Sequence, residues 1–374
     1  MSARPGAVLL TGATGFVGME VLARYLEHSD RDVITLVRAD GDDAARARIE
    51  SVLRNLFGRG ADRYSGRVRA VAAELTARGL GLAPQRRAGL ASRVTTIVHS
   101  AASVSFALPL HEARAINVEG TRRMLEFAEL ARDHGGLERY GQVSTAYVAG
   151  THEGRFGEAD LDVRQEFRNT YEQSKYEAEG LVRARRDLPC TILRPSIVVG
   201  DRRSGWTAAF NVLYWPLRAF ARGLFTSVPA IPSAPVDVVS VDYVADAIHA
   251  LCEAPGCAGE TFHLTAGANA STMGEIAQLA SRYFRRPMPA VIPPAEFEAL
   301  DGGAAAGAAI EGSSVYFPYF SIATVFDDAG AREQLAPAGI QASPLRDYLE
   351  RLLDYATRSR WGKRPIPRAE ALAA

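Results

Sequence analysis

The sequence has few cysteines and no excess of either charge, and these absences exclude several protein classes. The three cysteines, Cys190, Cys252 and Cys257, are odd in number and match no zinc spacing, so we expect neither a disulfide framework nor a metal site. Such cysteine usage fits a reducing cytoplasm. The 43 basic and 43 acidic side chains cancel, so we expect no overall positive field that would attract nucleic acid.

Long apolar runs are also missing. A membrane helix needs about 20 apolar residues, and the most apolar helical segment, 208–225, contains Pro216, Arg218 and Arg222. We therefore expect no transmembrane segment. The first strand-like run starts at Ala7, which leaves no room for a secretory signal before it. The 374 residues, with 47% apolar and 23% charged side chains, suit one large cytoplasmic domain or a domain with a smaller lobe.

Short apolar runs alternate with helical patterns through the first two-thirds of the chain. This alternation predicts an α/β protein with a doubly wound parallel sheet, the Rossmann fold. The expected strands are 7–10, 32–37, 67–71, 95–98, 140–143 and 190–193, and the expected helices are 18–28, 44–57, 113–133 and 171–185.

The pattern changes after Gly200, where aromatic residues, prolines and glycines become frequent. We expect residues 1–200 to form the nucleotide-binding Rossmann domain, with 236–265 returning to it, and a smaller C-terminal substrate lobe beside it. The lobe and a C-terminal helix would comprise 201–235 and 266–374. Within these ranges we expect helices at 241–252, 273–284 and 344–358 and strands at 236–239 and 260–264. We also expect a proline-rich crossing at 287–294 and a Gly/Ala-rich mobile loop or loosely packed helix at 302–309.

Three glycines lie three residues apart between the first expected strand and helix: Gly12, Gly15 and Gly18. A dinucleotide-binding turn needs the first for a tight bend, the second for close approach to the pyrophosphate and the third for helix packing. The helix N-terminus then offers free N–H groups to the phosphates. The pattern predicts a dinucleotide site, and the competing interpretation is a turn that only tightens packing.

The cofactor preference rests on the end of the second strand, where NAD-binding folds usually carry an acidic residue. Arg38 stands there instead, and its guanidinium suits a 2′-phosphate. Arg48, on the next helix, would reach the same phosphate. We therefore predict NADP(H) as the cofactor. Both arginines could instead be solvated surface cations, and nearby Asp40 leaves NAD open.

A tyrosine and a lysine four residues apart, Tyr171 and Lys175, lie on one face of an expected helix. The lysine ammonium would lower the tyrosine pKa from about 10 and ready the phenol for proton transfer. Thr145 follows an expected strand, where α/β sheets place ligand-binding groups, and its hydroxyl would hold a carbonyl oxygen. We predict these three residues as catalytic, against the alternative of a chance pair on a surface helix.

These features belong to a longer series of motifs: Thr11–Gly18, His99–Phe106, Asn117–Thr121, Ser144–Val148, Asn169–Lys175, Leu193–Gly200 and Asp237–Ala245. In this order they resemble the extended short-chain dehydrogenases/reductases. The segments 99–106 and 144–148 favour the fatty acyl reductase and thioester reductase (male-sterility-type) branch over sugar epimerases. The resemblance covers about residues 7–265 and only weakly the rest.

The resemblance implies a role for further residues in cofactor binding, in addition to the three catalytic groups: Gly12, Thr14, Gly15, Phe16, Val17, Arg38, Arg48, Glu74, Leu75, Ser100, Ala101, Ala102, Asn117, Lys175, Pro195, Ser196 and Val198. One departure is visible after the third strand. Ala73, Glu74 and Leu75 stand where the family usually has Gly-Asp-Leu, so Glu74 would meet the adenine less directly. Asn117 would either take part in the reaction or only join strand ends.

The activity that the resemblance implies is reduction of an acyl thioester or an aldehyde by NADPH, to an aldehyde and then an alcohol. A carrier-bound acyl or peptidyl group would require a separate carrier protein, since the chain has no carrier region of its own. The alternatives are a sugar-nucleotide epimerase or dehydratase, a hydroxysteroid-type dehydrogenase, and a scaffold that binds NADPH without turnover.

The aromatic residues after Gly200 are candidates for the wall that contacts an apolar acyl group. They would otherwise form the core of the lobe, with no ligand contact. The residues concerned are Phe210, Tyr214, Trp215, Phe220 and Phe225.

Overall fold

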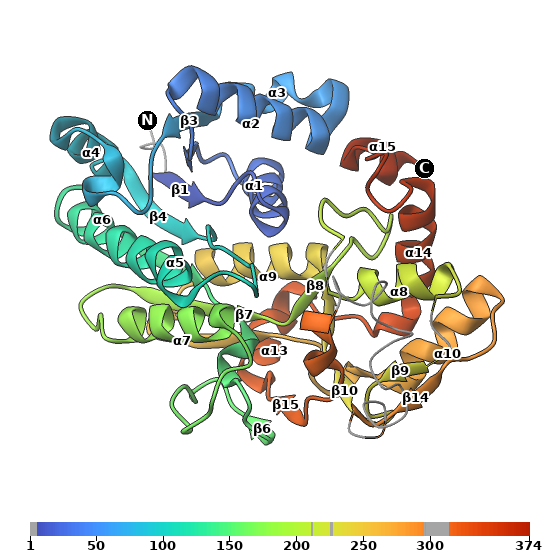
Figure 1. Ribbon diagram of the computed structural model, residues 1–374. Coiled ribbons are helices and arrows are strands. Elements are labelled where there is room, and N and C mark those ends of the chain that lie inside the picture. The colour runs from blue at the N-terminus through green and yellow to red at the C-terminus, as the bar shows by residue number, and fades with distance from the viewer. Residues whose placement is uncertain (1–5, 211, 225–226, 295, 297–313) are drawn as a thin grey trace.

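The computed structural model describes the whole chain except residues 1–5, 211, 225–226, 295 and 297–313. Its centre is a seven-stranded sheet with every neighbouring pair parallel and the order β12-β7-β5-β4-β1-β2-β3 (Figure 1). The order reverses between β1 and β4, which opens a crevice at the carboxyl ends of these strands. The strands are β1 Ala7–Thr11, β2 Val33–Val37, β3 Val68–Ala72, β4 Val94–His99, β5 Arg139–Val143, β7 Cys190–Pro195 and β12 Thr261–Leu264.

Helices cover both faces of the sheet because successive strand side chains point to opposite faces. Val8 and Leu10 of β1 belong to the core shared with α1, α2 and α9, whereas Ala7 and Leu9 belong to the core under α4, α6 and the end of α7. These helices are α1 Phe16–His28, α2 Asp42–Phe57, α4 Pro84–Ala91, α6 Gly120–Gly135, α7 Thr170–Arg183 and α9 Val241–Glu253. The expected doubly wound Rossmann fold is confirmed.

Most elements lie within a few residues of their expected bounds, but α4 was not expected and several other elements differ. The strand expected over 236–239 is divided into Pro235–Val236 and Val238–Ser240, which pair outside the central sheet. The helix expected over 113–133 is divided, because a π-helical turn at Ala115–Glu119 separates α5 Leu110–Arg114 from α6. The helix expected over 344–358 starts as a 3-10 turn at Leu345–Asp347 and becomes α14 only at Leu349–Arg358. The proline-rich crossing contains a short strand, β14 Ala290–Ile292, and the loop expected at 302–309 lies outside the described residues.

The remaining strands form small two-stranded sheets beside the main one. Three of these pairs are parallel and join segments far apart in the sequence, whereas β10 and β13 are antiparallel. The pairs are β6 Gly154–Phe156 with β15 Thr324–Phe326, β8 Ile197–Val199 with β11 Val238–Ser240, β9 Ser227–Pro229 with β14, and β10 Pro235–Val236 with β13 Ser271–Thr272. Further helices are α3 Asp62–Ser65, α8 Tyr214–Ala221 and α10 Met273–Phe284.

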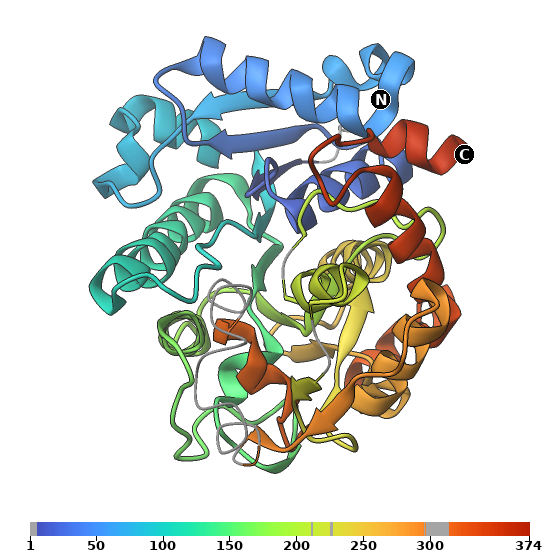
Figure 2. The same ribbon diagram turned by 45° about the vertical axis from the view of Figure 1, so that its right-hand side comes forward.

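Two helices of the range 266–374 pack on the sheet unit. The side chains of α13 Ala329–Leu335 join the core of α1, α2 and α9, and so does Ala371 of α15 Arg368–Ala373. Arg368 forms an ion pair with Glu20 of α1, and its N–H donates to Asn55 of α2. The red C-terminal helix therefore lies beside the blue helices of the opposite terminus (Figures 1 and 2). Within the described ranges, none of the helices combines the length and apolarity needed to cross a membrane.

Candidate active site

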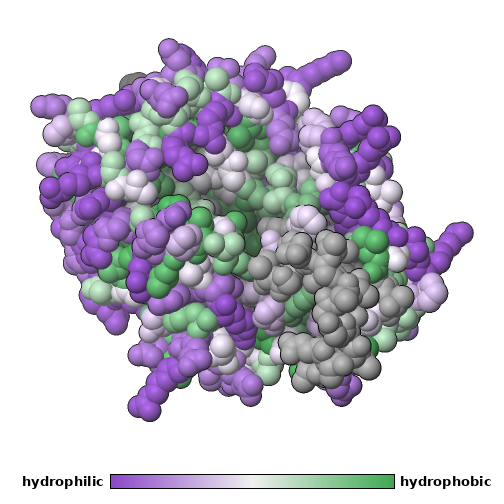
Figure 3. All heavy atoms as spheres, in the orientation of Figure 1, coloured by the Kyte–Doolittle hydropathy of each residue, from purple (hydrophilic) through white to green (hydrophobic). Residues whose placement is uncertain are grey.

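A cavity of about 700 Å³ opens at the carboxyl ends of the sheet strands. In the space-filling view, apolar side chains surround a hollow near the middle of this face (Figure 3). The cavity brings together almost all the residues predicted from the sequence: Gly12, Thr14, Gly15, Phe16, Val17, Arg38, Arg48, Glu74, Leu75, Ser100, Ala101, Ala102, Thr145, Tyr171, Lys175, Pro195, Ser196 and Val198.

The glycine turn is built so closely that side chains are excluded at two positions. Gly12 has φ +78°, and a Cβ atom there would lie 2.8 Å from the Ala101 nitrogen. A Cβ on Gly18 would lie 2.1 Å from the Gly12 carbonyl oxygen. Helix α1 then begins after Gly15 with no side-chain cap and no acidic residue in its first turn. Free N–H groups and open backbone are what a pyrophosphate requires, so the turn fits a dinucleotide.

Beneath the turn, the hydroxyl of Thr11 joins β1 to the loop after β4. It accepts hydrogen bonds from the Ser100 and Ala101 nitrogens at 3.2 and 3.1 Å, and it lies 2.7 Å from His99 Nδ1. Burial, together with the nearby Lys175 charge, lowers the pKa of His99 to about 3. His99 is therefore neutral at physiological pH, and this network fixes the two loops that face each other across the crevice.

Two arginines meet at the end of β2. Arg48 NH1 donates to the Arg38 carbonyl oxygen at 2.5 Å, and NH2 lies 3.4 Å from Thr14 Oγ1 in the glycine turn. Both side chains are exposed at the cavity rim. Next to them, Glu74 also lines the cavity, but its Oε1 accepts from the Thr76 nitrogen and hydroxyl at 3.1 and 2.9 Å. The cavity rim thus carries two cations, Arg38 and Arg48. The carboxylate of Glu74 beside them is already hydrogen-bonded to Thr76.

Asn117 lies behind the cavity wall, in the π-helical turn. Its Oδ1 accepts from the Ser103 nitrogen at 2.8 Å, and its Nδ2 donates to the Ser103 carbonyl oxygen and to Ser174 Oγ at 3.0 and 2.9 Å. The side chain is 3% exposed, so these bonds satisfy both ends of its amide. This geometry favours the structural alternative, in which Asn117 joins the loop after β4 to α7.

The three predicted catalytic residues come from two elements that meet at the cavity. Thr145 follows β5, where its Oγ1 accepts from the Tyr147 nitrogen at 3.3 Å and lies 3.4 Å from the Pro195 carbonyl oxygen. Tyr171 is in the first turn of α7 and Lys175 is one turn later. The Lys175 ammonium is buried and donates to the Val143 carbonyl oxygen at 2.8 Å.

The expected lowering of the Tyr171 pKa by Lys175 is wrong. Burial raises the pKa of Tyr171 to about 12, although a hydrogen bond with Thr145 acts in the opposite direction. Burial also lowers the pKa of Lys175 to about 8, against the attraction of Glu179. The sequence could not show how deeply the pair is enclosed. At neutral pH Tyr171 is therefore a phenol, which is the form that can donate a proton.

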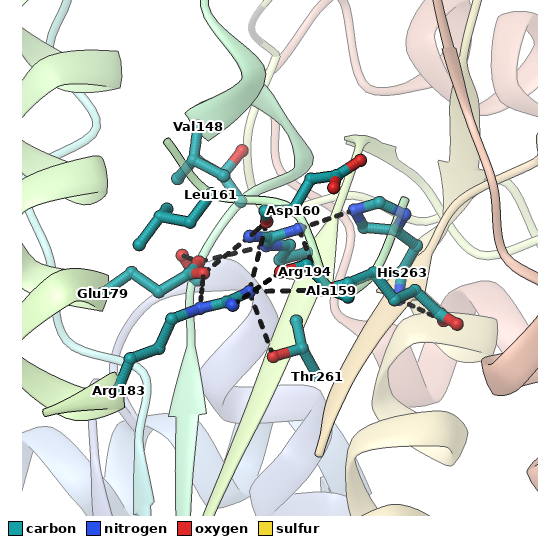
Figure 4. A network of polar contacts seen from close by, with 12 residues as sticks. Val148, Ala159, Asp160, Leu161, Glu179, Arg183, Arg194, Thr261 and His263 are labelled. Atoms are coloured by element: carbon teal, nitrogen blue, oxygen red, sulfur yellow. Dashed lines mark hydrogen bonds and ion pairs between the residues drawn. The ribbon is translucent and has the colours of Figure 1, made fainter. Parts of the chain in front are cut away.

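A buried ion network holds α7 against the sheet (Figure 4). Glu179 Oε1 lies 2.7 Å from Arg194 NH2 and 3.0 Å from Arg183 Nε, and Oε2 accepts from Ser144 Oγ at 2.7 Å. Burial alone would raise the pKa of Glu179, but Arg194 and Arg183 keep it below its usual range. His263 completes the network, 3.0 Å from Arg194 NH1. Because Ser144 precedes Thr145, the network also fixes the strand end that carries Thr145.

None of the four described aromatic residues considered for the acyl wall lines the cavity, which supports the alternative in which they have no ligand contact. Tyr214 and Phe220 are buried in the lobe core, Phe210 packs on Tyr214 and Tyr355, and Trp215 is 41% exposed. The fifth residue, Phe225, lies outside the described residues. From this segment only Ala209 and Val212 line the cavity among the described residues. The other side chains at this end are Val104, Phe106, Ile116, Tyr147, Tyr316 and Tyr319.

The tyrosines of this wall could not be inferred from the sequence. Tyr316 and Tyr319 lie in a 3-10 helix, η6 Ser314–Phe320, that contains Pro318 and has no helical periodicity. The ring of Phe106 stacks on Tyr171 at 5.6 Å and on Tyr319 at 5.2 Å between centroids. Phe106 is the last residue of the His99–Phe106 motif, and this motif is the only signal in the sequence that points to the aromatic wall.

The comparisons with known proteins decide the family. The family model described as "Male sterility protein" (NAD_binding_4) matches residues 10–248. The chain belongs to this family. It has an NAD(P)-binding fold and is related to reductase domains and to fatty acyl reductases.

Two relatives illustrate the range of the family. The chain is 36% identical over 217 residues to the isonitrile lipopeptide synthase of Streptomyces coeruleorubidus, which covers 58% of this chain and 15% of that protein. It is 29% identical over 273 residues to the putative fatty acyl-CoA reductase CG8303 of Drosophila melanogaster, covering 63% of this chain and 50% of the relative. The chain thus spans half the length of these relatives or less.

Solved structures agree with the fold. The terminal R domain from the myxalamid PKS-NRPS pathway matches with a TM-score of 0.84 and 26% identity, covering 98% of this chain and 94% of that one. A thiolation-reductase di-domain from an archaeal non-ribosomal peptide synthetase gives 0.77 and 23%, covering 95% and 76%. UDP-glucuronic acid 4-epimerase from Bacillus cereus, in complex with NAD, gives 0.66 and 18%, covering 95% and 98%. The last two show the fold alone.

Proposed function

We propose that this protein reduces an acyl thioester with NADPH, releasing an aldehyde and a thiol, and that Tyr171 donates the proton. The observation that carries the proposal is the position of Thr145, Tyr171 and Lys175 on the wall of one cavity. The glycine turn lies at one end of that cavity and an apolar, aromatic wall at the other. An acyl group at the aromatic end would bring its carbonyl between the cofactor site and the phenol.

The bound cofactor would supply the hydride that reduces the carbonyl carbon. The carbonyl oxygen gains negative charge as this happens, and Tyr171 would donate its proton to that oxygen. The Thr145 hydroxyl would turn from the Pro195 carbonyl, a long contact of 3.4 Å, and donate a second hydrogen bond. The product of this step is a hemithioacetal, which collapses to an aldehyde and a free thiol. A second reduction would convert the aldehyde into an alcohol.

Lys175 would serve binding and electrostatics. Its ammonium is held by the Val143 carbonyl oxygen beside the helix face of Tyr171, where it can hold the ribose hydroxyls of the nicotinamide nucleoside. Pro195, Ser196 and Val198 line the same part of the cavity and would flank the nicotinamide. A positive charge close to the reacting oxygen also favours the developing anion.

The preference for NADPH over NADH rests on the two arginines at the end of β2. A 2′-phosphate at this rim would meet Arg38 and Arg48, and guanidinium groups bind phosphate through paired, charge-assisted hydrogen bonds. Epimerases of the same fold keep NAD through the whole reaction, so this cation pair favours a reductase.

The acyl group would be delivered as a thioester of coenzyme A or of a carrier protein. A carrier is supported by the terminal R domain of a PKS-NRPS pathway, which is 26% identical to this chain. Coenzyme A is supported by the relative described as a putative fatty acyl-CoA reductase. We propose a domain division in which residues 1–200 with 236–265 hold the cofactor. The rest of the chain adds Ala209, Val212, Tyr316 and Tyr319 to a substrate wall that residues of the first unit also line.

The experiment that tests the proposal is a steady-state screen of NADPH oxidation. Purified protein is offered acyl-CoA, carrier-bound acyl thioesters and aldehydes of several chain lengths, with NADH and UDP-sugars in parallel. We expect NADPH oxidation with at least one thioester class. Absence of oxidation with every thioester and aldehyde would contradict the proposal, and conversion of a UDP-sugar would favour an epimerase instead.

A further inference from the structure

Helix α7 carries Tyr171 in its first turn, and the N-cap of that helix is contacted by a residue from a distant part of the chain. The N-cap is Asn169, whose Oδ1 accepts from the Glu172 nitrogen at 3.0 Å. The other end of the same amide donates to the hydroxyl of Tyr319 at 2.8 Å. Tyr319 therefore contacts the N-cap of the helix from 150 residues further along the chain.

The hydroxyl of Tyr319 also closes a ring of hydrogen bonds around the first turn. It donates to Glu172 Oε1 at 2.5 Å, while Glu172 Oε2 accepts from the Arg168 nitrogen at 2.9 Å. The guanidinium of Arg168 is 3.5 Å from the same carboxylate. Glu172 and Tyr319 are 0% and 2% exposed. A buried carboxylate is costly unless each oxygen has a donor, so the ring depends on the Tyr319 hydroxyl.

A second contact joins Tyr319 to the catalytic tyrosine through the substrate wall. The ring of Phe106 lies between the rings of Tyr171 and Tyr319 and stacks on both, with interplanar angles of 29° and 20°. Tyr147, beside Thr145, packs edge-on against Tyr319 at 4.9 Å. Stacked aromatic rings have preferred offsets and tilts, so this stack restrains the plane of the phenol. Both contacts of Tyr319 thus act on Tyr171, one through its helix and one through its ring.

We propose that Tyr319 is a positioning residue for the proton donor. It fixes the first turn of α7 through Asn169 and Glu172, and it fixes the plane of the Tyr171 ring through Phe106. Tyr319 also lines the acyl end of the cavity. The wall that contacts the substrate is therefore coupled to the position of the group that protonates it. The inference rests on the proposed function in taking Tyr171 as the donor.

The test compares Tyr319→Phe with the wild type and with a matched control. The variant keeps the ring and its stacking, but removes the hydroxyl that bonds to Asn169 and Glu172. Tyr283→Phe is the control, because it also deletes a tyrosine hydroxyl bonded to a carboxylate, Asp354 at 2.6 Å, on α10 away from the cavity. We expect Tyr319→Phe to lower kcat about tenfold with little change in KM, since proton donation and not binding is misaligned.

Two further readouts separate positioning from a general loss of structure. Hydrogen exchange in the peptide 168–176 should become faster in Tyr319→Phe and stay unchanged in Tyr283→Phe, and this measurement needs no turnover. In the double variant with Glu172→Gln, the loss in kcat should be smaller than the product of the single losses, because both act through one bond. Wild-type kcat and wild-type exchange in Tyr319→Phe would overturn the proposal.

If the wild type were inactive but hydrogen exchange were still faster in Tyr319→Phe, the proposed function would be refuted. The coupling of Tyr319 to the first turn of α7 would stand. If Tyr283→Phe lost as much kcat as Tyr319→Phe, the loss would reflect only a general structural effect of removing a tyrosine hydroxyl. The assignment of Tyr319 as a positioning residue would then be overturned.

Discussion

Replacing Lys175 by methionine should stabilise the protein at neutral pH while removing its activity. Burial lowers the pKa of Lys175 from its ordinary value of 10.5 to about 8. At about 1.4 kcal/mol per pH unit, this corresponds to about 3 kcal/mol of native-state free energy. Methionine removes that cost but also the hydrogen bond to the Val143 carbonyl oxygen, which is worth about 1 to 3 kcal/mol. We expect the variant to be about 0.5 to 2 kcal/mol more stable at pH 7.

The sign can be tested by the pH dependence of this difference. Between pH 8 and 10.5 the unfolded wild type binds more protons at Lys175 than the native state does, so its stability rises with pH relative to the variant. The difference in stability should therefore move by about 2 kcal/mol toward the wild type between pH 7 and 9.5, so the advantage of the variant disappears or reverses. Urea unfolding of both proteins at several pH values measures this difference in stability. All other titrating groups are the same in the two proteins, so their contributions cancel in the difference. A variant that is less stable at pH 7, or a gap independent of pH, would refute the reasoning.

Three further variants test the cofactor site and its support. Arg38→Gln should weaken NADPH binding by about tenfold to a hundredfold and leave NADH unchanged, in a fluorescence titration; equal effects on both would contradict the 2′-phosphate contact. Gly18→Ala should abolish cofactor binding, since its Cβ would lie 2.1 Å from a carbonyl oxygen, whereas Gly89→Ala, with no atom within 4 Å, should bind normally. Glu179→Gln should cost about 3 to 5 kcal/mol in urea unfolding, because Arg194 is left buried without its counter-charge; a cost below about 1 kcal/mol would count against the network.

Much of the sheet unit could be predicted because its signals are local. Buried parallel strands give continuous apolar runs, and β1, β4 and β7 begin and end within two residues of the runs that predicted them. The glycine turn is recognisable because steric exclusion at Gly12 and Gly18 leaves no other residue type possible. Helix α4 was missed because Pro84–Ala91 contains two arginines and few apolar residues, and it buries only its last two positions.

The substrate end of the site could not be predicted, because it depends on contacts between distant segments. Tyr319 acquires its role only when η6 packs against the N-cap of α7, and nothing near it in the sequence indicates this. The state of Tyr171 is a similar case. A tyrosine four residues before a lysine suggests a lowered pKa, but the enclosure that raises it is a property of the folded chain.

The central claim is that hydride transfer to a thioester releases a thiol, with Tyr171 as the proton donor. The measurement that tests it most directly records NADPH consumption and free thiol together, for the wild type and for Tyr171→Phe. We predict one thiol released per NADPH if the aldehyde is the product, or one per two NADPH if the alcohol is. Tyr171→Phe should bind NADPH normally and release almost no thiol. NADPH consumption without thiol release, or equal turnover in the variant, would contradict the account.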